Sequence, residues 1–362
     1  MNFQSGIPDL HRFPKKEFAK LYQAVWNELP DNALRYQSTA GIMELRQAIV
    51  NYLSRSRGLN CSVRNLMIVS GATQGLSLLS KLLYGNDSKV IMENPTHDGL
   101  MQIIAKEGYQ IVGVRSDDYG LNTDLLEPSN NLSFVYTTPS HQYPLGGILP
   151  IQRRIALVQY AMSNGCYIVE DDYDSEFRYE GQPASSLYEM NPEKVIYIGS
   201  FSKILSPSLR IGYMLLPDEL IAPYLHLKQH SDVHTEAITQ FVLAKFIENG
   251  GLERHLWKMK KVYARKRQHL IDTLHMYLPD EFELKGHATG LHIIVRFHHI
   301  TFTEELLQKI NRGNVKVYPI EKYEFQKSGL HSNEILLGYG HLEDTEITEG
   351  IKILSEVIYG NR

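Results

Sequence analysis

The chain has 362 residues, of which 43% are hydrophobic and 22% are charged, a composition sufficient for two or three hydrophobic cores. The formal net charge of −4 gives no general attraction for nucleic acid, and no apolar run approaches the length that crosses a bilayer. Its two cysteines, Cys61 and Cys166, are far apart and outside any metal-ligand spacing. We therefore expect a cytoplasmic protein with no nucleic-acid or membrane partner and no metal.

The first two thirds of the chain alternate short apolar runs with amphipathic ones. Apolar residues between Leu45 and Leu53 follow helix spacing, and Gly58 offers a stop. Predicted strands are 66–69, 90–92, 111–114, 134–136, 167–169 and 195–198, and predicted helices include 72–83 and 151–162. Such alternation predicts a mostly parallel sheet covered by helices on both faces.

The last third has a different pattern. An amphipathic stretch covers 235–278, and it is followed by strand-like segments at 291–297, 315–318 and 335–337 and by a final helix near 346–358. This pattern predicts a second, smaller α/β unit. We assign 45–240 to a large cofactor-binding domain and 1–44 with 241–362 to a small domain.

A lysine follows the last of these predicted central strands, in Gly-Ser-Phe-Ser-Lys (199–203). At a strand end such a lysine can be desolvated, so that its neutral amine forms a Schiff base. Ser200, Ser202 and Arg210 offer donors to a phosphate. A lysine in a polar loop, taken alone, is more often a solvated surface residue.

Two other strand ends carry polar groups. Glu170-Asp171-Asp172-Tyr173 follows one strand, and three consecutive acids are costly to bury unless they are paired or functional. Carboxylates at such positions also serve as helix caps or metal ligands. The small-residue turn at 70–75 precedes a helix whose free N–H groups can bind phosphate. Neither a Walker A loop nor a GxGxxG fingerprint is present.

In this order and spacing the three segments resemble fold type I pyridoxal-phosphate enzymes, the aminotransferases of class I and II. The strings at 138–146, 169–179 and 199–213 are most similar to the aminotransferase domain of MocR-type proteins, as are 6–10, 40–46 and 337–342. The resemblance implies a large domain with a mostly parallel seven-stranded sheet between helices, plus a smaller α/β domain. The residues before Gly6 leave no room for a winged-helix domain, so we expect no transcription-factor role of the usual form.

The resemblance also implies a role for each matching residue. Lys203 would form the Schiff base with pyridoxal 5′-phosphate and later carry the proton between substrate carbons. Asp171 would pair with the pyridine nitrogen and Tyr173 with the phenolic oxygen. Tyr36 would reach the phosphate of the neighbouring subunit, which implies a homodimer with shared sites. The complete predicted cofactor set is Tyr36, Gly71, Ala72, Thr73, His97, His141, Asp171, Tyr173, Ser200, Ser202, Lys203 and Arg210.

Two departures from the family pattern concern the substrate. His97 stands where an aromatic residue usually stacks on the cofactor ring, and it either replaces that residue neutrally or also exchanges protons. Leu336 stands where an arginine usually grips the substrate α-carboxylate. Either another arginine compensates, with Arg296 and Arg178 as candidates, or the substrate lacks a conventional α-carboxylate.

We therefore predict an aminotransferase that moves an amino group between an amino acid or amine and a keto acid. Two alternatives stay open on the same scaffold. The first is a pyridoxal-phosphate lyase, decarboxylase, racemase or oxidase. The second is a non-catalytic sensor that binds the cofactor and passes a change of shape to a partner.

Overall fold

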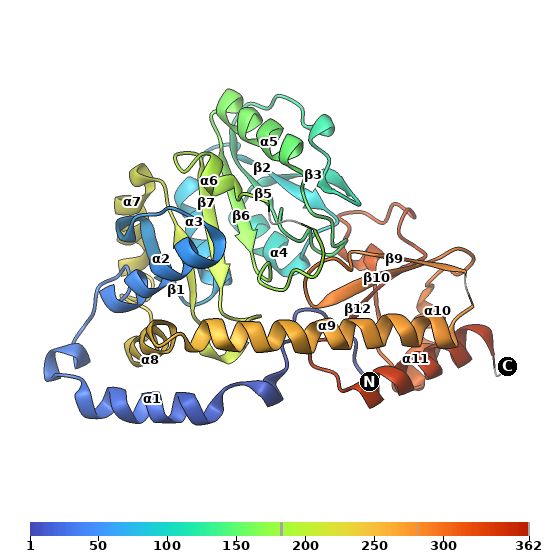
Figure 1. Cartoon of the computed structure of the whole chain (residues 1–362). Helices are drawn as coiled ribbons and strands as arrows, with labels where there is room; N and C mark the ends of the chain where they lie inside the picture. Colours follow the sequence, from blue (N-terminus) through green and yellow to red (C-terminus); the bar gives the residue numbers. More distant parts are fainter. Residues whose placement is uncertain (182–183, 280, 361–362) are drawn as a thin grey trace.

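The computed structural model describes residues 1–181, 184–279 and 281–360, which form two α/β units side by side (Figure 1). The helix α9 (Gly251–Tyr277) runs beneath both units. Both ends of the described chain lie beside the unit built from the C-terminal third. The chain therefore enters the large unit from the small one and returns to it.

The large unit contains an eight-stranded sheet in the order β1-β8-β7-β6-β5-β2-β3-β4. Its strands are β1 (Leu66–Val69), β2 (Lys89–Asn94), β3 (Gln110–Asp117), β4 (Gly120–Leu121), β5 (Leu132–Thr137), β6 (Tyr167–Asp172), β7 (Val195–Ser200) and β8 (Gly212–Leu215). The five strands from β7 to β3 pair in parallel, whereas β8 is antiparallel to both of its neighbours. The predicted mostly parallel sheet is confirmed.

The two faces of this sheet bury separate cores, because successive side chains of a strand point to opposite faces. In β1, Leu66 and Ile68 join one core, and Met67 and Val69 join the other. Helices α2 (Met43–Arg57), α5 (Ile151–Asn164) and α8 (Ala237–Glu248) contribute to the first core. Helices α3 (Ala72–Leu83), α4 (Asp98–Lys106) and α7 (Asp218–Gln229) contribute to the second. The sheet is thus covered on both faces, as the alternating pattern predicts.

Glycines end or separate several helices where a left-handed residue is needed. Gly58 ends α2 with φ 68°, the stop that the sequence predicts. Gly250, also with φ 68°, divides the predicted stretch 235–278 into α8 and α9. The amphipathic pattern continues through this break, so periodicity alone does not reveal it.

The small unit is a four-stranded antiparallel sheet in the order β11-β12-β10-β9, with helices packed against it. Its strands are β9 (Phe282–Lys285), β10 (His292–Phe297), β11 (Tyr318–Pro319) and β12 (Glu334–Gly338), and its helices are α10 (Glu304–Arg312) and α11 (Asp344–Tyr359). The first residues of the chain pair here, since Phe3 N–H donates to Lys316 and Gly338 N–H donates to Phe3. By contrast, α1 (Lys15–Glu28) packs beside α8 of the large unit.

The strand β8 is not among the six strands predicted from the apolar runs. The sheet exceeds the seven strands that the resemblance implies by the two-residue strand β4, which pairs with β3 in a hairpin at the edge. Two residues are too few for a periodic signal, which explains the miss. The short helix α6 (Leu187–Met190) is missed for the same reason. In the described part of the chain, no helix is long and apolar enough to cross a membrane. The division into 45–240 and 1–44 with 241–362 stays a prediction.

Candidate active site

The predicted site residues other than Tyr36 gather at one edge of the large sheet. They follow the carboxyl ends of β1, β2, β5, β6 and β7, which run in the same direction: β2, β5, β6 and β7 pair in parallel, and β1 is antiparallel to β8, which is itself antiparallel to β7. The crevice outside the carboxyl ends of such strands is the usual ligand site of an open α/β sheet. The topology therefore explains how residues from 71 to 210 meet.

Lys203 is half-buried just beyond β7. Burial lowers the pKa of its amine, while the carboxylates of Asp174 and Asp171 act in the opposite direction. A Cβ built on Gly6 would lie 2.8 Å from the Nζ atom of Lys203, so the N-terminal segment passes directly against the amine. The amine is thus enclosed by the large sheet and the first residues of the chain.

Asp171 is the buried carboxylate at the end of β6 and is 6% exposed. Burial raises its pKa to about 6, and a hydrogen bond from the Tyr136 hydroxyl, 2.6 Å from Oδ2, lowers it in part. Sequence reasoning missed Tyr136. Its signal is a hydroxyl near the end of β5, in a strand that is otherwise mostly apolar.

The two flanking acids point to the opposite face of β6 from Asp171, as strand alternation requires. Asp172 binds the guanidinium of Arg57 and accepts a hydrogen bond from Tyr197. Glu170 is fully buried, accepts a hydrogen bond from the Tyr188 N–H and lies 3.6 Å from Arg154. These acids therefore have structural partners, and only the middle carboxylate faces the candidate site.

A buried chain of rings lines the side of the site toward the small unit. Tyr173 donates its hydroxyl to the carbonyl of His141 at 2.9 Å, and the two rings stack. His141 Nδ1 lies 2.9 Å from the carboxylate of Asp174, and its other face stacks on His292 at 4.6 Å between centroids. His141 Nε2 is buried without a hydrogen-bond partner among the described residues. Sequence reasoning missed Asp174 and His292, because long-range packing brings them to this place.

A cradle suited to an anion lies at the start of α3. No side chain of the described chain caps this helix, so the N–H groups of Ala72 and Thr73 point outward from its first turn. Gly71 has φ 85°, and a Cβ there would lie 2.8 Å from Arg210 Nη2, so only glycine fits. Arg210 donates to the carbonyl of Ser70, beside this turn. The hydroxyl oxygen of Ser200 accepts a hydrogen bond from the N–H of Ser202, in the segment that leads to Lys203.

Four of the predicted residues are exposed: Tyr36, Thr73, His97 and Arg210. His97 is exposed as a whole residue, but its ring lies 5.4 Å from the ring of Tyr143, and partial desolvation of the ring together with the nearby Lys203 lowers its pKa. Tyr36 is 86% exposed and contacts His234 edge to face. Among the described residues, no hydrogen bond or ring contact joins Tyr36 to the Lys203 cluster.

Leu336 is fully buried in the small sheet. Its apolar cluster includes Ile294 and Leu145, and Tyr143 packs against it. Arg296 lies on the same face of this sheet, but Glu334 binds its Nε at 2.5 Å and Glu283 lies 3.4 Å from Nη1. The wall expected to hold a carboxylate-binding cation is therefore apolar and aromatic.

Comparisons with known proteins agree with this arrangement. The family described as Aminotransferase class I and II matches residues 1–330. The HTH-type transcriptional regulator YdeL of Bacillus subtilis is 33% identical over 98% of this chain and 76% of its own length. The 2-aminoadipate transaminase of Thermus thermophilus is 29% identical over 99% of this chain and 90% of its own length.

Solved structures of aminotransferases share this fold. The multiple substrate aminotransferase of Thermococcus profundus superposes with a TM-score of 0.90 at 27% identity, covering 99% of this chain and 90% of that one. The fold and the lysine-centred site define a fold type I α/β protein. This chain belongs to the class I and II aminotransferase family.

Proposed function

We propose that the protein transfers an amino group between an amine or amino acid and a keto acid, with pyridoxal phosphate attached through Lys203. The observation that carries this proposal is the half-buried amine of Lys203, placed beside Asp171 and Asp174 at the carboxyl edge of the sheet. Burial favours the neutral amine, which is the form that attacks a carbonyl carbon. Pyridoxal phosphate, when bound, supplies an electron sink for the substrate carbon.

The residues of the site fit this cofactor. The N–H groups of Ala72 and Thr73, the hydroxyl of Ser200 and the guanidinium of Arg210 would hold its phosphate, and the absence of a Cβ at Gly71 leaves the approach open. Asp171 would face the pyridine nitrogen. A positive charge there would offset the burial that raises the pKa of this carboxylate.

The amine of Lys203 would also move the proton at the substrate carbon, because burial lowers the pKa of this amine and so favours its neutral, basic form. Tyr173 and His141 would orient the cofactor from the side of the small unit. The unpartnered Nε2 of His141 supports this role, since it is a buried polar atom that needs a partner. His97 would cover the ring as a mostly neutral imidazole, because its pKa is lowered.

We infer that the preferred amino donor carries no carboxylate on the carbon that bears the amine. Leu336 is apolar, Arg296 is bound by Glu334, and Arg178 lines a different cavity. A carboxylate desolvated against Leu145 and Tyr143 without a cation would cost several kcal/mol. The same wall favours, as a second candidate function, another fate of the substrate carbon on this scaffold, such as elimination or oxidation.

Tyr36 supports a homodimer with shared sites. Its large side chain is 86% exposed, and an exposed aromatic ring of this size is more typical of an interface than of a free surface. In the proposed assembly this residue would reach the site of the partner subunit. A monomer by sedimentation at micromolar concentration, in protein that is active, would contradict this part of the proposal.

The test compares matched substrate pairs by following the visible absorption of the bound cofactor. Phenethylamine with phenylalanine, and tyramine with tyrosine, differ only in the carboxylate. We expect the amine of each pair to convert the cofactor with a kcat/KM at least tenfold higher, with loss of all conversion in Lys203→Ala. Equal or better conversion of the amino acids would refute the inferred donor. Release of ammonia or hydrogen peroxide together with the aldehyde or keto product, with no nitrogen retained on the cofactor, would favour the second candidate.

A further inference from the structure

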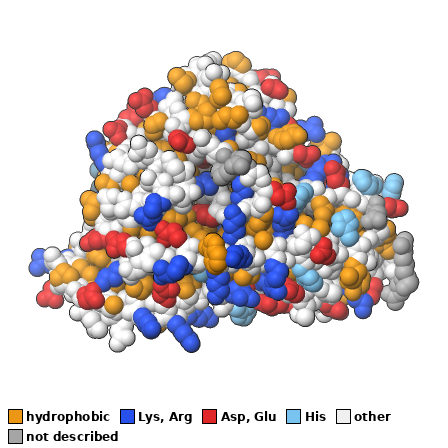
Figure 2. Space-filling view, viewed as in Figure 1, with side chains coloured by type: hydrophobic (Ala, Val, Ile, Leu, Met, Phe, Trp, Pro, Cys, Tyr) orange, Lys and Arg blue, Asp and Glu red, His pale blue; other side chains and the backbone are white. Residues whose placement is uncertain are grey.

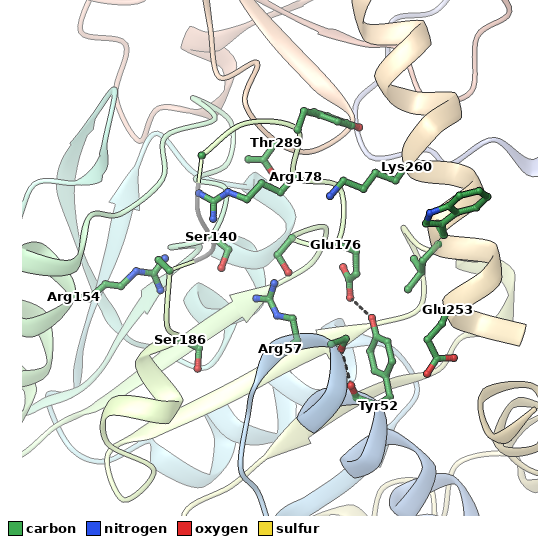
Figure 3. Close-up of a pocket in the computed structure, with 17 residues that line it drawn as sticks. Tyr52, Arg57, Ser140, Arg154, Glu176, Arg178, Ser186, Glu253, Lys260 and Thr289 are labelled. Carbon is green, nitrogen blue, oxygen red and sulfur yellow. Dashed lines mark hydrogen bonds between the residues drawn. The ribbon is translucent and has the colours of Figure 1, made fainter. Parts of the chain in front are cut away.

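A second cavity, of about 640 Å³, is shown in Figure 3. It lies beside the candidate active site, because its lining residues Ser140 and Ser175 are the chain neighbours of His141 and Asp174. It is formed by the end of α2, the segment after β6 and the first turns of α9, and Lys203 is not among its lining residues. Asp174 contacts His141 on one side of the segment, whereas Ser175, Glu176 and Arg178 line the cavity. Figure 2 shows Lys and Arg side chains gathered across the middle of this face.

Three guanidinium groups approach one part of this cavity, those of Arg57, Arg154 and Arg178 (Figure 3). Two of them are already satisfied. Arg57 binds Asp172, and Arg154 donates to the carbonyls of Leu149, Ser185 and Pro139 and lies near Glu170. Their charges are therefore balanced within the protein.

The positive charge of Arg178 is not balanced in this way. Its Nε donates to the carbonyl of Glu180 at 3.1 Å, and across residues 1–181, 184–279 and 281–360 no acceptor is found for its two Nη groups. Burial and the positive charge of Arg57 both lower its pKa, so the surroundings oppose its charge. An additional anion would relieve both effects. Lys260, on α9, adds a further positive charge with no acidic partner in the described structure.

The acids of the cavity do not supply this missing charge. Glu253 is bound by Arg55 at 2.6 Å, and Glu176 accepts a hydrogen bond from Tyr52 at 3.0 Å. Ser175 has a buried hydroxyl oxygen without a described hydrogen-bond partner. The cavity thus combines an unpaired planar guanidinium, an amine and a free hydroxyl, with Trp257 and Tyr179 as aromatic walls.

We propose that this cavity is a second ligand site that binds a small organic anion bearing phosphate or carboxylate groups. The two Nη groups of Arg178 would bind two oxygens of one such group, and Lys260 would meet a second. The volume suits a metabolite-sized molecule. This site is independent of the amino-group chemistry proposed at Lys203.

The test is a calorimetric titration of the cofactor-loaded protein with citrate and, separately, with inorganic phosphate. The loaded protein is used so that the cofactor occupies its own phosphate cradle. We expect saturable binding of one equivalent, weakened by added salt. Arg178→Gln should weaken the binding at least tenfold and Lys260→Gln about threefold. Tighter binding of citrate than of phosphate would identify the ligand as a polycarboxylate, and the reverse as an organic phosphate.

Lys258→Gln is the matched control, because Lys258 is exposed on the same helix and does not line the cavity. We expect its binding to equal that of the wild type. Binding that is unchanged in Arg178→Gln would overturn the proposal, as would the absence of saturable binding of either anion. Because Arg178 is half-buried, its variant is used only if it melts cooperatively. Lys260→Glu, at an exposed position, should abolish binding and provides an independent test.

Discussion

The hydroxyl of Tyr136 lies 2.6 Å from Oδ2 of Asp171, and both groups are buried between the strands β5 and β6. The hydrogen bond favours the ionised carboxylate and opposes the burial that raises its pKa to about 6. Tyr136 would therefore act as a positioning residue, which keeps Asp171 charged and directed toward the proposed cofactor.

The variant Tyr136→Phe should raise the pKa of Asp171 further, because it removes a donor to the charged form. We expect cofactor affinity to fall about five- to tenfold near pH 6–7 and to recover most of that loss at pH 8, where the carboxylate ionises in both proteins. Cofactor absorbance titrations at the three pH values measure this. Tyr160→Phe, which removes only a bond to the carbonyl of Glu127, is the control. An equal loss at all pH values would mean that the effect is one of packing.

Position 6 must be glycine, because the amine of Lys203 lies close to where a Cβ atom would be. Gly6→Ala places a Cβ 2.8 Å from Nζ at a residue with φ 68°, so the lysine must move. We expect cofactor attachment, followed by the visible band, to slow at least tenfold. Gly58→Ala is a close control, since Gly58 has the same φ of 68° with no atom within 4 Å of the added Cβ. Both variants should lose about 1 kcal/mol of stability from backbone strain. Equal attachment rates in the two variants would contradict the contact with Lys203.

Glu93 makes stability depend on pH. It is fully buried, and burial raises its pKa to about 7 in spite of hydrogen bonds from Thr137, Thr138 and Gln142. The folded protein holds this proton to a higher pH than the unfolded chain does, since the ordinary value is 4.5. The contribution of Glu93 to stability is therefore present below pH 4.5 and is lost as the pH rises to about 7.

We expect Glu93→Gln to lose less stability than the wild type between pH 5 and pH 8, by up to about 3 kcal/mol, because glutamine does not titrate. Urea unfolding at both pH values, at one fixed protein concentration, measures the difference. Glu349→Gln, at an exposed position of α11, should follow the wild type. If the free energy of unfolding were the same at pH 5 and pH 8 in both the wild type and the variant, Glu93 would ionise normally and the prediction would be wrong.

The N-terminal segment is attached to α9 by a buried ion pair. Lys266 Nζ lies 2.9 Å from Asp9 Oδ2, neither side chain is exposed, and the same amine donates to the carbonyl of Gly340. Lys266→Met should destabilise the protein by about 3–5 kcal/mol, because it leaves a buried carboxylate with only Arg12 beside it. Thermal unfolding measures this, with Lys258→Met as the exposed control. A loss below 1 kcal/mol would mean that Asp9 takes up a proton or water in compensation.

Most of the large sheet is predictable from sequence, because strands such as 66–69 are short apolar runs and helices such as 72–83 have a helical periodicity. The carboxyl ends of the parallel strands β6 and β7 then bring Asp171 and Lys203 to one edge, and Gly71 joins them there because β1 and β7 are both antiparallel to β8. At this edge, the locally predicted elements and the order of the strands together determine where these residues lie.

Contacts between distant segments are not predictable in this way. The stacking of His141 on His292 joins the large unit to the small one, and the position of Gly6 against Lys203 depends on the N-terminal segment crossing back. The engagement of Arg296 by Glu334 also depends on a strand register that the sequence does not reveal. These relationships decide which cations remain available to a substrate.

The pairing of Phe3 with Lys316 and Gly338 also concerns the order of events during synthesis. At typical translation rates, roughly 20 to 70 s pass between the emergence of the first of these residues and the last. In the last part of that interval, after β8 has left the ribosome, all eight strands of the large sheet are present while the segment that carries Gly6 still lacks β12 to pair with. The nascent chain thus presents the amine of Lys203 uncovered, and the small unit closes over it only when translation is nearly complete.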